Sequence, residues 1–292
     1  MRLDTPEGNF PPTRRVVAAS LFMSGYAAAS VSASAQPIAT PGDDLVLEDV
    51  HVVGADDYQL PAYVARPGDR GVHGAVIVVN EIFGIHDYIK DVCRRFAREG
   101  YVAIAPDYFD RAGDPAPLTD MAAIRDIVAT ANNAQVMGDT AGAVAWLKQQ
   151  SFVKGDAIGI TGFCWGGTVV WMAAAQHADI KAGVAWYGRL VRPQQGSWGA
   201  DEDRQWPTDI AARLHAPVLG LYAENDRGIP LESVEAMRAA LQSVSNPTHS
   251  EIVVYPGVTH GFHADYRESY NADAAADGWS RALAWFRRNG VA

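Results

Sequence analysis

The strongest chemical signal in the 292-residue chain is the motif Gly162-Phe163-Cys164-Trp165-Gly166-Gly167. It follows a short apolar run and precedes an apolar helical pattern, so it predicts a sharp strand-to-helix turn. Such a turn needs small residues two positions before and two positions after its central residue, and Gly162 and Gly166 meet that need. The partial positive charge of a helix N-terminus favours the thiolate form of Cys164, which is the nucleophilic form. The alternative is a buried structural cysteine in a glycine-rich turn.

A cysteine nucleophile needs a base, and the base needs an acid that orients it. In one large class of hydrolases these groups follow in the chain order nucleophile, acid, histidine. His260 lies just past the last predicted strand, in Pro256-Gly257-Val258-Thr259-His260-Gly261-Phe262. Asp226 follows the preceding strand, in Ala223-Glu224-Asn225-Asp226. The order predicts a Cys164–His260–Asp226 triad.

Two neighbouring residues leave alternatives open. Glu224 competes with Asp226 for the acid role, but it is nearer the strand end and less free to reach over the edge. His263 lies three residues after His260. An exposed histidine pair is the ordinary explanation of that spacing. A metal pair is the other, but no third ligand is evident and no metal is expected.

From Asp43 onward, strand and helix patterns alternate. The predicted strands are Leu45–Val53, Tyr58–Arg66, Ala75–Val79, Val102–Ala105, Ala157–Thr161, Ala182–Trp186, Val218–Tyr222 and Glu251–Tyr255. The predicted helices are His86–Glu99, Thr119–Ala131, Met137–Gln149, Thr168–His177, Leu231–Ser243 and Ala274–Arg288. Unbroken apolar strands alternating with helices predict an α/β fold with a mainly parallel central sheet, helices on both faces and an antiparallel hairpin at its start.

No internal repeat or linker divides residues 43–292, which predicts a single domain. One stretch, Arg189–His215, is too long for an ordinary connection between a strand and a helix. It leaves the carboxyl edge of the sheet, where open α/β sheets place their ligands. A substrate lid and a surface insertion are nearly equal interpretations.

The ordered set of motifs resembles the dienelactone hydrolase family, which belongs to the α/β-hydrolase superfamily and includes carboxymethylenebutenolidases. The elbow around Cys164, the later Asp226, and His260 before Gly261-Phe262 all have counterparts there, as does Asn80-Glu81-Ile82-Phe83-Gly84. The resemblance covers about Leu45–Phe286.

The resemblance implies an ester or lactone hydrolase that needs no cofactor. It implies that Glu81 pairs with the Cys164 thiol at rest and helps to create the thiolate as substrate binds. The residues alone equally allow Glu81 to be a salt-bridge partner at a strand end. The backbone N–H groups of Ile82 and Trp165 are then expected to hold the oxyanion, each such donor typically contributing roughly 3–4 kcal/mol.

Relatives that act on dienelactones hold a substrate carboxylate with arginines. Arg111 is the expected counterpart of one of these arginines. The other family arginine lies four residues after the catalytic histidine, where this chain has Ala264, and Arg267 is the candidate replacement. Tyr187 is expected to line the pocket with Trp165. The competing functions are a broader carboxylesterase or thioesterase with the same triad and a non-catalytic exported binding protein.

Composition narrows the partners. The formal net charge is −10 and no Lys/Arg cluster is present, so nucleic acid is not expected as a partner. A small-molecule ester or lactone is expected instead, with the chain a monomer or weak homo-oligomer. The chain has two cysteines, too few for a disulfide framework. Cys93 falls on the apolar stripe of its helix, so it is expected to be buried and free.

Residues 1–35 are interpreted as a secretory signal. Arg2, Arg14 and Arg15 form a positive region, a mildly apolar run follows, and Ala33-Ser34-Ala35 offers a cleavage site before Gln36. The run is too short and too weak to be a stable membrane anchor. The Arg14-Arg15 pair resembles a twin-arginine signal but lacks the usual Phe. We therefore expect an exported, periplasmic protein; a disordered extension of a cytosolic protein is the alternative.

Overall fold

The structure is a computed structural model that describes residues 37–200, 205–244 and 248–292. The signal predicted for residues 1–35 lies outside the described residues. Within them no helix is long and apolar enough to cross a membrane.

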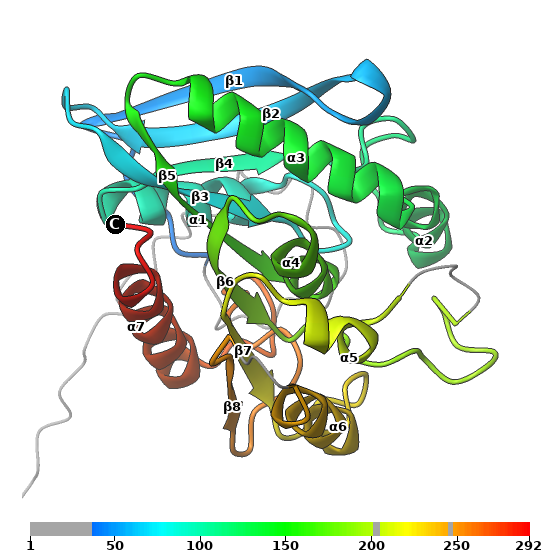
Figure 1. Cartoon of the computed structure of the whole chain (residues 1–292). Coiled ribbons are helices and arrows are strands. Elements are labelled where there is room, and N and C mark those ends of the chain that lie inside the picture. The colour runs from blue at the N-terminus through cyan, green and yellow to red at the C-terminus, as the bar shows by residue number, and fades with distance from the viewer. Residues whose placement is uncertain (1–36, 201–204, 245–247) are drawn as a thin grey trace, which may run out of the picture.

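An eight-stranded sheet crosses the domain, with helices on both of its faces (Figure 1). The strands are β1 (Leu45–Val53), β2 (Gln59–Pro67), β3 (His73–Val79), β4 (Val102–Pro106), β5 (Val153–Phe163), β6 (Ile180–Trp186), β7 (Val218–Ala223) and β8 (Glu251–Tyr255). Their order is β1-β2-β4-β3-β5-β6-β7-β8. β2 pairs antiparallel with β1 and β4, and all other neighbours pair parallel. The fold is therefore the predicted α/β-hydrolase fold, with an antiparallel hairpin at its start.

The helices are α1 (Asp87–Arg98), α2 (Met121–Thr130), α3 (Asn133–Gln149), α4 (Trp165–Gln176), α5 (Pro207–Ile210), α6 (Leu231–Gln242) and α7 (Ala272–Arg288). The apolar stripe predicted for α1 is confirmed, because Ile89, Val92 and Phe96 are all buried. Gly100 follows α1 with φ +88°, a left-handed conformation that glycine adopts at little cost and that ends the helix. α1 packs beside α7, where the Phe96 and Trp279 rings lie 4.5 Å apart, whereas α3 and α4 cover the other face.

Helix α4 differs from its prediction in a way that matters for the site. It begins at Trp165, directly after Cys164, and not at Thr168. Gly166 and Gly167 have poor intrinsic helix propensity, so the sequence pattern alone places the start too late. Tertiary packing nevertheless requires glycine in this helical turn, because a Cβ on Gly166 would lie 2.5 Å from the Val79 carbonyl oxygen. The first turn of α4 is therefore glycine because neighbouring backbone touches it.

The carboxyl ends of the parallel strands meet at one edge of the sheet. Glu81 follows β3, Cys164 follows β5, Tyr187 follows β6, Asp226 follows β7 and His260 follows β8. These residues are far apart in sequence, yet the strand order places them along a single edge, where α/β sheets bind ligands.

Candidate active site

Cys164 occupies a strained turn between β5 and α4. Its φ of 54° and ψ of −115° lie in a region that residues with side chains rarely adopt, and such strain persists only where the surroundings enforce it. The Cys164 N–H donates to the Trp186 carbonyl at 3.0 Å, which ties the turn to β6. A Cβ on Gly162 would lie 2.3 Å from the Gly166 carbonyl oxygen, so the turn closes only with glycine there. The geometry is that of a nucleophile elbow.

His260 and Asp226 form a directly hydrogen-bonded pair. His260 Nδ1 lies 2.6 Å from Asp226 Oδ2, and it must be the donor because an ionised carboxylate only accepts. The other oxygen, Asp226 Oδ1, accepts from the N–H groups of Gly228 at 2.8 Å and Ile229 at 3.1 Å. These bonds fix the carboxylate, and the carboxylate fixes the imidazole. The ring edge that carries Nε2 is left free of Asp226, and His260 lines the same cavity as Cys164.

Two opposing effects set the protonation of His260. Burial disfavours the imidazolium, but the neighbouring charges of Cys164 and Asp226 and their hydrogen bonds favour it and prevail. The pKa of His260 is therefore raised above its ordinary value. A raised pKa suits a group that must carry a proton to a leaving group.

Glu224, the competing acid, does not reach His260. Its Oε2 accepts from the N–H of Gly257 at 2.7 Å, in the loop that carries His260. The backbone of Asn225 also donates to the Val258 carbonyl at 2.8 Å. Glu224 therefore joins the acid loop to the histidine loop and supports the pair formed by Asp226.

Glu81 is fully buried, but its contacts differ from those that the family resemblance implies. Tyr266 Oη donates to Glu81 Oε2 at 2.6 Å, and Arg267 Nη2 lies 3.3 Å from Oε1. His86 Nε2 is 4.0 Å away, and burial lowers the pKa of His86 to about 4. Within the described chain no hydrogen bond or ion pair joins Glu81 to Cys164. The expected resting pair with the thiol is therefore not what this structure contains.

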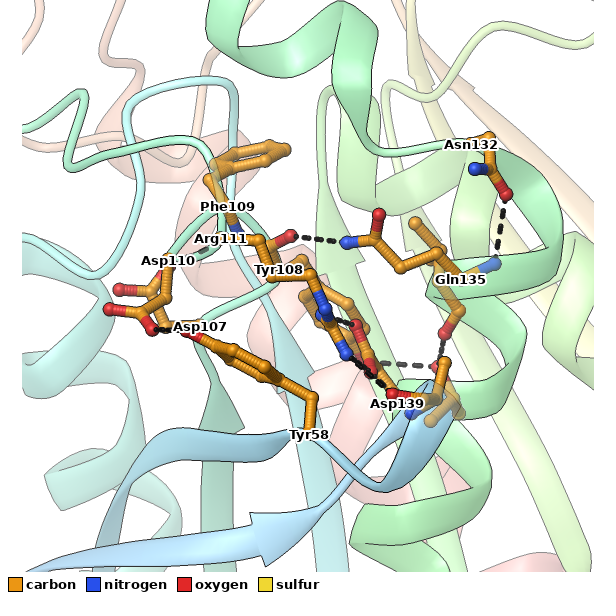
Figure 2. Close-up of polar contacts among 12 residues, drawn as sticks. Tyr58, Asp107, Tyr108, Phe109, Asp110, Arg111, Asn132, Gln135 and Asp139 are labelled. Atoms are coloured by element: carbon orange, nitrogen blue, oxygen red, sulfur yellow. Dashed lines mark hydrogen bonds and ion pairs between the residues drawn. The ribbon is translucent and has the colours of Figure 1, made fainter.

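Arg111 does not line the cavity that contains Cys164, which corrects its expected role as a substrate clamp; it pairs with Asp139 instead (Figure 2). Its Nη1 lies 2.7 Å from Oδ2 of the fully buried Asp139, and its Nη2 lies 2.8 Å from Oδ1. The guanidinium also donates to the Ala55 carbonyl and covers the Tyr58 ring, with the Arg111 Cζ atom 4.2 Å from the ring centre. Arg111 thus fastens the loop after β4 to α3 and to the β1–β2 turn.

His263 is buried, which corrects the expectation of an exposed histidine pair. Its imidazole is buried between the rings of Trp186, 4.5 Å away, and Phe163, 5.2 Å away. Its Nδ1 lies 2.6 Å from Tyr88 Oη, and burial holds its pKa well below the ordinary value. In the part of the chain that the structure describes, no three His, Cys, Asp or Glu side chains are grouped as metal ligands.

A cavity of about 530 Å³ opens over the sulfur. Cys164, His260 and Asp226 line it together with the expected Ile82, Trp165 and Tyr187. The insertion contributes as well: Arg189 and Trp198 form part of the wall. This contact favours the lid interpretation of Arg189–His215 over a mere surface insertion.

Sequence reasoning missed several residues around the cavity. Arg227 and Ile229 line it beside Asp226, and Tyr266 Oη donates a hydrogen bond to Glu81 Oε2. The adjacency of Arg227 to the candidate acid is a signal in the sequence that could have pointed to it. Nothing in the sequence indicated Trp198, whose position depends on how the insertion folds back.

The fold and the elbow define the chain as an α/β-hydrolase. The model of the dienelactone hydrolase family matches residues 60–290, and the chain belongs to that family. It is an enzyme of the class that hydrolyses esters and lactones.

Individual relatives agree. A Methylorubrum extorquens protein named "Putative carboxymethylenebutenolidase" is 44% identical over 282 residues, which are 96% of this chain and 94% of the relative. A Bradyrhizobium protein named "Probable 2-oxo-3-(5-oxofuran-2-ylidene)propanoate lactonase" is 32% identical over 80% of this chain and 92% of its own. The crystal structure of a "Putative Dienelactone Hydrolase" from Klebsiella pneumoniae is 43% identical, with a TM-score of 0.77 over 84% of this chain and 99% of its own.

Proposed function

We propose that the protein hydrolyses a small carboxylic ester or lactone through a cysteine nucleophile and a thioester intermediate. One observation supports the proposal: the strained elbow at Cys164 and the hydrogen-bonded pair of His260 and Asp226 line the same cavity. A nucleophile, a base and an orienting acid are the parts that acyl transfer requires.

In the first half-reaction His260 takes the proton of the Cys164 thiol as the sulfur attacks the carbonyl carbon, so the sulfur–hydrogen bond breaks and a carbon–sulfur bond forms. The carbonyl oxygen becomes an oxyanion, for which the backbone N–H groups of Ile82 and Trp165 are the proposed donors, since both residues line the cavity. Collapse of this intermediate breaks the carbon–oxygen bond of the ester. The departing alkoxide takes its proton from His260, and the acyl group stays on sulfur.

In the second half-reaction His260 removes a proton from water, and the resulting hydroxide attacks the thioester. The carbon–sulfur bond breaks, the carboxylic acid leaves, and the proton on His260 restores the starting state of the pair. Asp226 holds the imidazole throughout. Glu81 is proposed to orient the side chains of Tyr266 and Arg267, which it contacts, rather than to exchange protons with Cys164.

A direct test is the Cys164→Ala variant with a p-nitrophenyl ester. Loss of a whole nucleophile typically costs roughly a thousandfold or more in kcat, so activity should fall to background while the melting temperature is retained. Cys93→Ala is the matched control, because Cys93 is buried in α1 away from the cavity. Rapid acid quenching of the wild type should trap an acyl group on the peptide that contains Cys164. An acyl group on another residue, or an active Cys164→Ala protein, contradicts the proposal.

We also propose that the chain is exported to the periplasm and cleaved near Ala35-Gln36. Thr40, which lies shortly after this point in the sequence, is held to α1. The Thr40 N–H donates to Asp91 Oδ1 at 2.6 Å, and Arg94 donates to the Thr40 carbonyl at 3.0 Å. Cleavage at the proposed site would leave these contacts intact. Cell fractionation with mass spectrometry of the N-terminus tests the proposal; an unprocessed cytosolic chain would refute it.

A further inference from the structure

Both arginines expected to bind a substrate anion are occupied by other carboxylates. Arg111 is held by Asp139 outside the cavity. Arg267 is held by Glu81 and donates to Tyr266 Oη at 3.2 Å, with only 17% of its side chain exposed. Each positive charge is thus compensated within the protein. If the cavity recognises an anion, the charge that does so must come from other residues.

Two other arginines line the cavity. Arg189 lies two residues beyond the Tyr187 that follows β6, and Arg227 follows Asp226 in the loop after β7. The Arg189 Nη1 donates to the Trp198 carbonyl at 2.7 Å, and its guanidinium lies over the Trp198 ring with 5.5 Å between the Cζ atom and the ring centre. These contacts fix the side chain but involve no carboxylate, so the charge of Arg189 remains available. Arg227 is exposed and has no ion pair within the described residues.

The same two arginines also line a second cavity, of about 490 Å³. Its wall shares Arg189, Arg227, Gly228 and Ile229 with the cavity over Cys164, so the two spaces adjoin. Glu232 supplies a carboxylate to the second cavity, and the guanidinium groups of Arg189 and Arg227 belong to the wall that the two cavities share.

We propose that Arg189 and Arg227 form an anion-binding subsite, which selects esters whose acyl group ends in a carboxylate set several bonds away from the scissile carbonyl. The scissile bond then lies over Cys164, and the terminal carboxylate reaches the boundary with the second cavity. The inference deepens the proposed function and depends on it for the identity of the reacting bond. It assigns the substrate an elongated anionic acyl group in place of a compact lactone bound by Arg111.

Because a hydrogen bond to a charged group is stronger than one between neutral groups, one guanidinium gives a preference of about tenfold or more for the anion over a neutral analogue. Because Arg227 is exposed, part of that preference is screened by salt. We therefore expect the preference for the anionic ester to weaken as the ionic strength rises.

The test compares two p-nitrophenyl esters of equal length: that of octanedioic acid with its far carboxylate free, and the same ester with that carboxylate methylated. Wild type should favour the free carboxylate in kcat/KM, and the ratio should fall about tenfold in Arg189→Gln and in Arg227→Gln. Arg227→Lys, which keeps the charge, should retain most of the preference. Arg70→Gln is the matched control, because Arg70 is exposed in the β2–β3 connection at the opposite edge of the sheet.

A binding measurement separates this inference from the proposed function. Octanedioate titrated calorimetrically into Cys164→Ala, which forms no acyl-enzyme, should bind, and adding Arg189→Gln or Arg227→Gln should weaken that binding about tenfold. If wild type hydrolyses neither ester, the proposed function fails while the binding result still decides on the subsite. Equal ester ratios in wild type and both glutamine variants, or octanedioate affinity independent of both arginines, overturn the subsite.

Discussion

The guanidinium of Arg111 forms a two-pronged ion pair with the carboxylate of Asp139, which is fully buried in α3. One further donor reaches that carboxylate, the Ala55 N–H at 2.8 Å. Removing the guanidinium leaves a buried charge with a single hydrogen bond, and such charges are costly.

Arg111→Ala should therefore destabilise the fold without changing substrate preference. Because Arg111 is partly exposed, with 21% of its side chain accessible, we expect a loss of about 2–3 kcal/mol in the free energy of unfolding. Urea denaturation provides the measurement, and the octanedioic ester pair provides the preference. A variant of unchanged stability that no longer favours the anionic ester would show that Arg111 binds substrate after all.

The two cysteines should react with a thiol reagent at very different rates. Burial raises the pKa of the Cys93 thiol and removes it from solvent, whereas Cys164 is partly exposed at the cavity. Thiolates are the reactive form, so Cys164 should be modified first and Cys93 only as the protein unfolds. Peptide mass spectrometry over a labelling time course distinguishes them. Equal rates in the folded protein, or no free thiol at all, would contradict the structure.

Asp226→Asn should change the pH dependence of catalysis. The charge of Asp226 helps to raise the pKa of His260, and the leaving group needs the protonated imidazole. Without that charge the pKa of His260 falls, so the alkaline limb of kcat/KM should move to lower pH by about one to three units. In the wild type the raised pKa of His260 stabilises the fold below the ordinary pKa of histidine, and this stabilisation is lost as the pH rises through the pKa of the folded state. In Asp226→Asn that loss should begin at a lower pH. Glu224→Gln is the control, and an unmoved limb in Asp226→Asn would exclude this role.

His263 should make the fold sensitive to acid. Its pKa is held well below the ordinary value by burial and then by the nearby charge of Arg95, so the folded state binds fewer protons than the unfolded chain. The free energy of unfolding should therefore fall below about pH 6.5, by about 1.4 kcal/mol per pH unit for one such histidine. His86 adds a fall of the same sign.

His263→Gln tests this, because glutamine can still hydrogen-bond Tyr88 but does not titrate. Urea unfolding at pH values from about 7 down to about 5 should show a slope shallower by about 1.4 kcal/mol per pH unit than in the wild type. His51→Gln on the exposed side of β1 serves as the control. An identical slope in His263→Gln would mean that the acid sensitivity arises elsewhere.

The sequence predicted the strands well, because they depend on local patterns. Apolar runs define the parallel strands, and β1 and β8 have the predicted bounds. The glycines around Cys164 identify the elbow, since a tight turn excludes side chains there.

Predictions that depended on partners distant in sequence were less successful. Arg111 follows β4 as expected, but the direction of its side chain depends on its ion pair with Asp139. Asp139 lies 28 positions later, and no local sequence pattern connects the two residues. The start of α4 was placed late because helix propensity does not register the backbone that packs against Gly166. Trp198 reaches the cavity through the path of an insertion that carries no periodic signal.

The bonds between the Asp226 and His260 loops have a consequence for how the enzyme can adapt to its substrate. The Glu224 carboxylate accepts from the Gly257 N–H, and the Asn225 N–H donates to the Val258 carbonyl. These bonds join the loop of Asp226 to the loop of His260, so the two side chains should move together. The sulfur belongs to a different unit, the β5 elbow anchored on β6. A conformational change on substrate binding should therefore alter the distance between the His260 imidazole and the Cys164 sulfur. Proton transfer between these two groups is then the step that a poorly fitting substrate slows most.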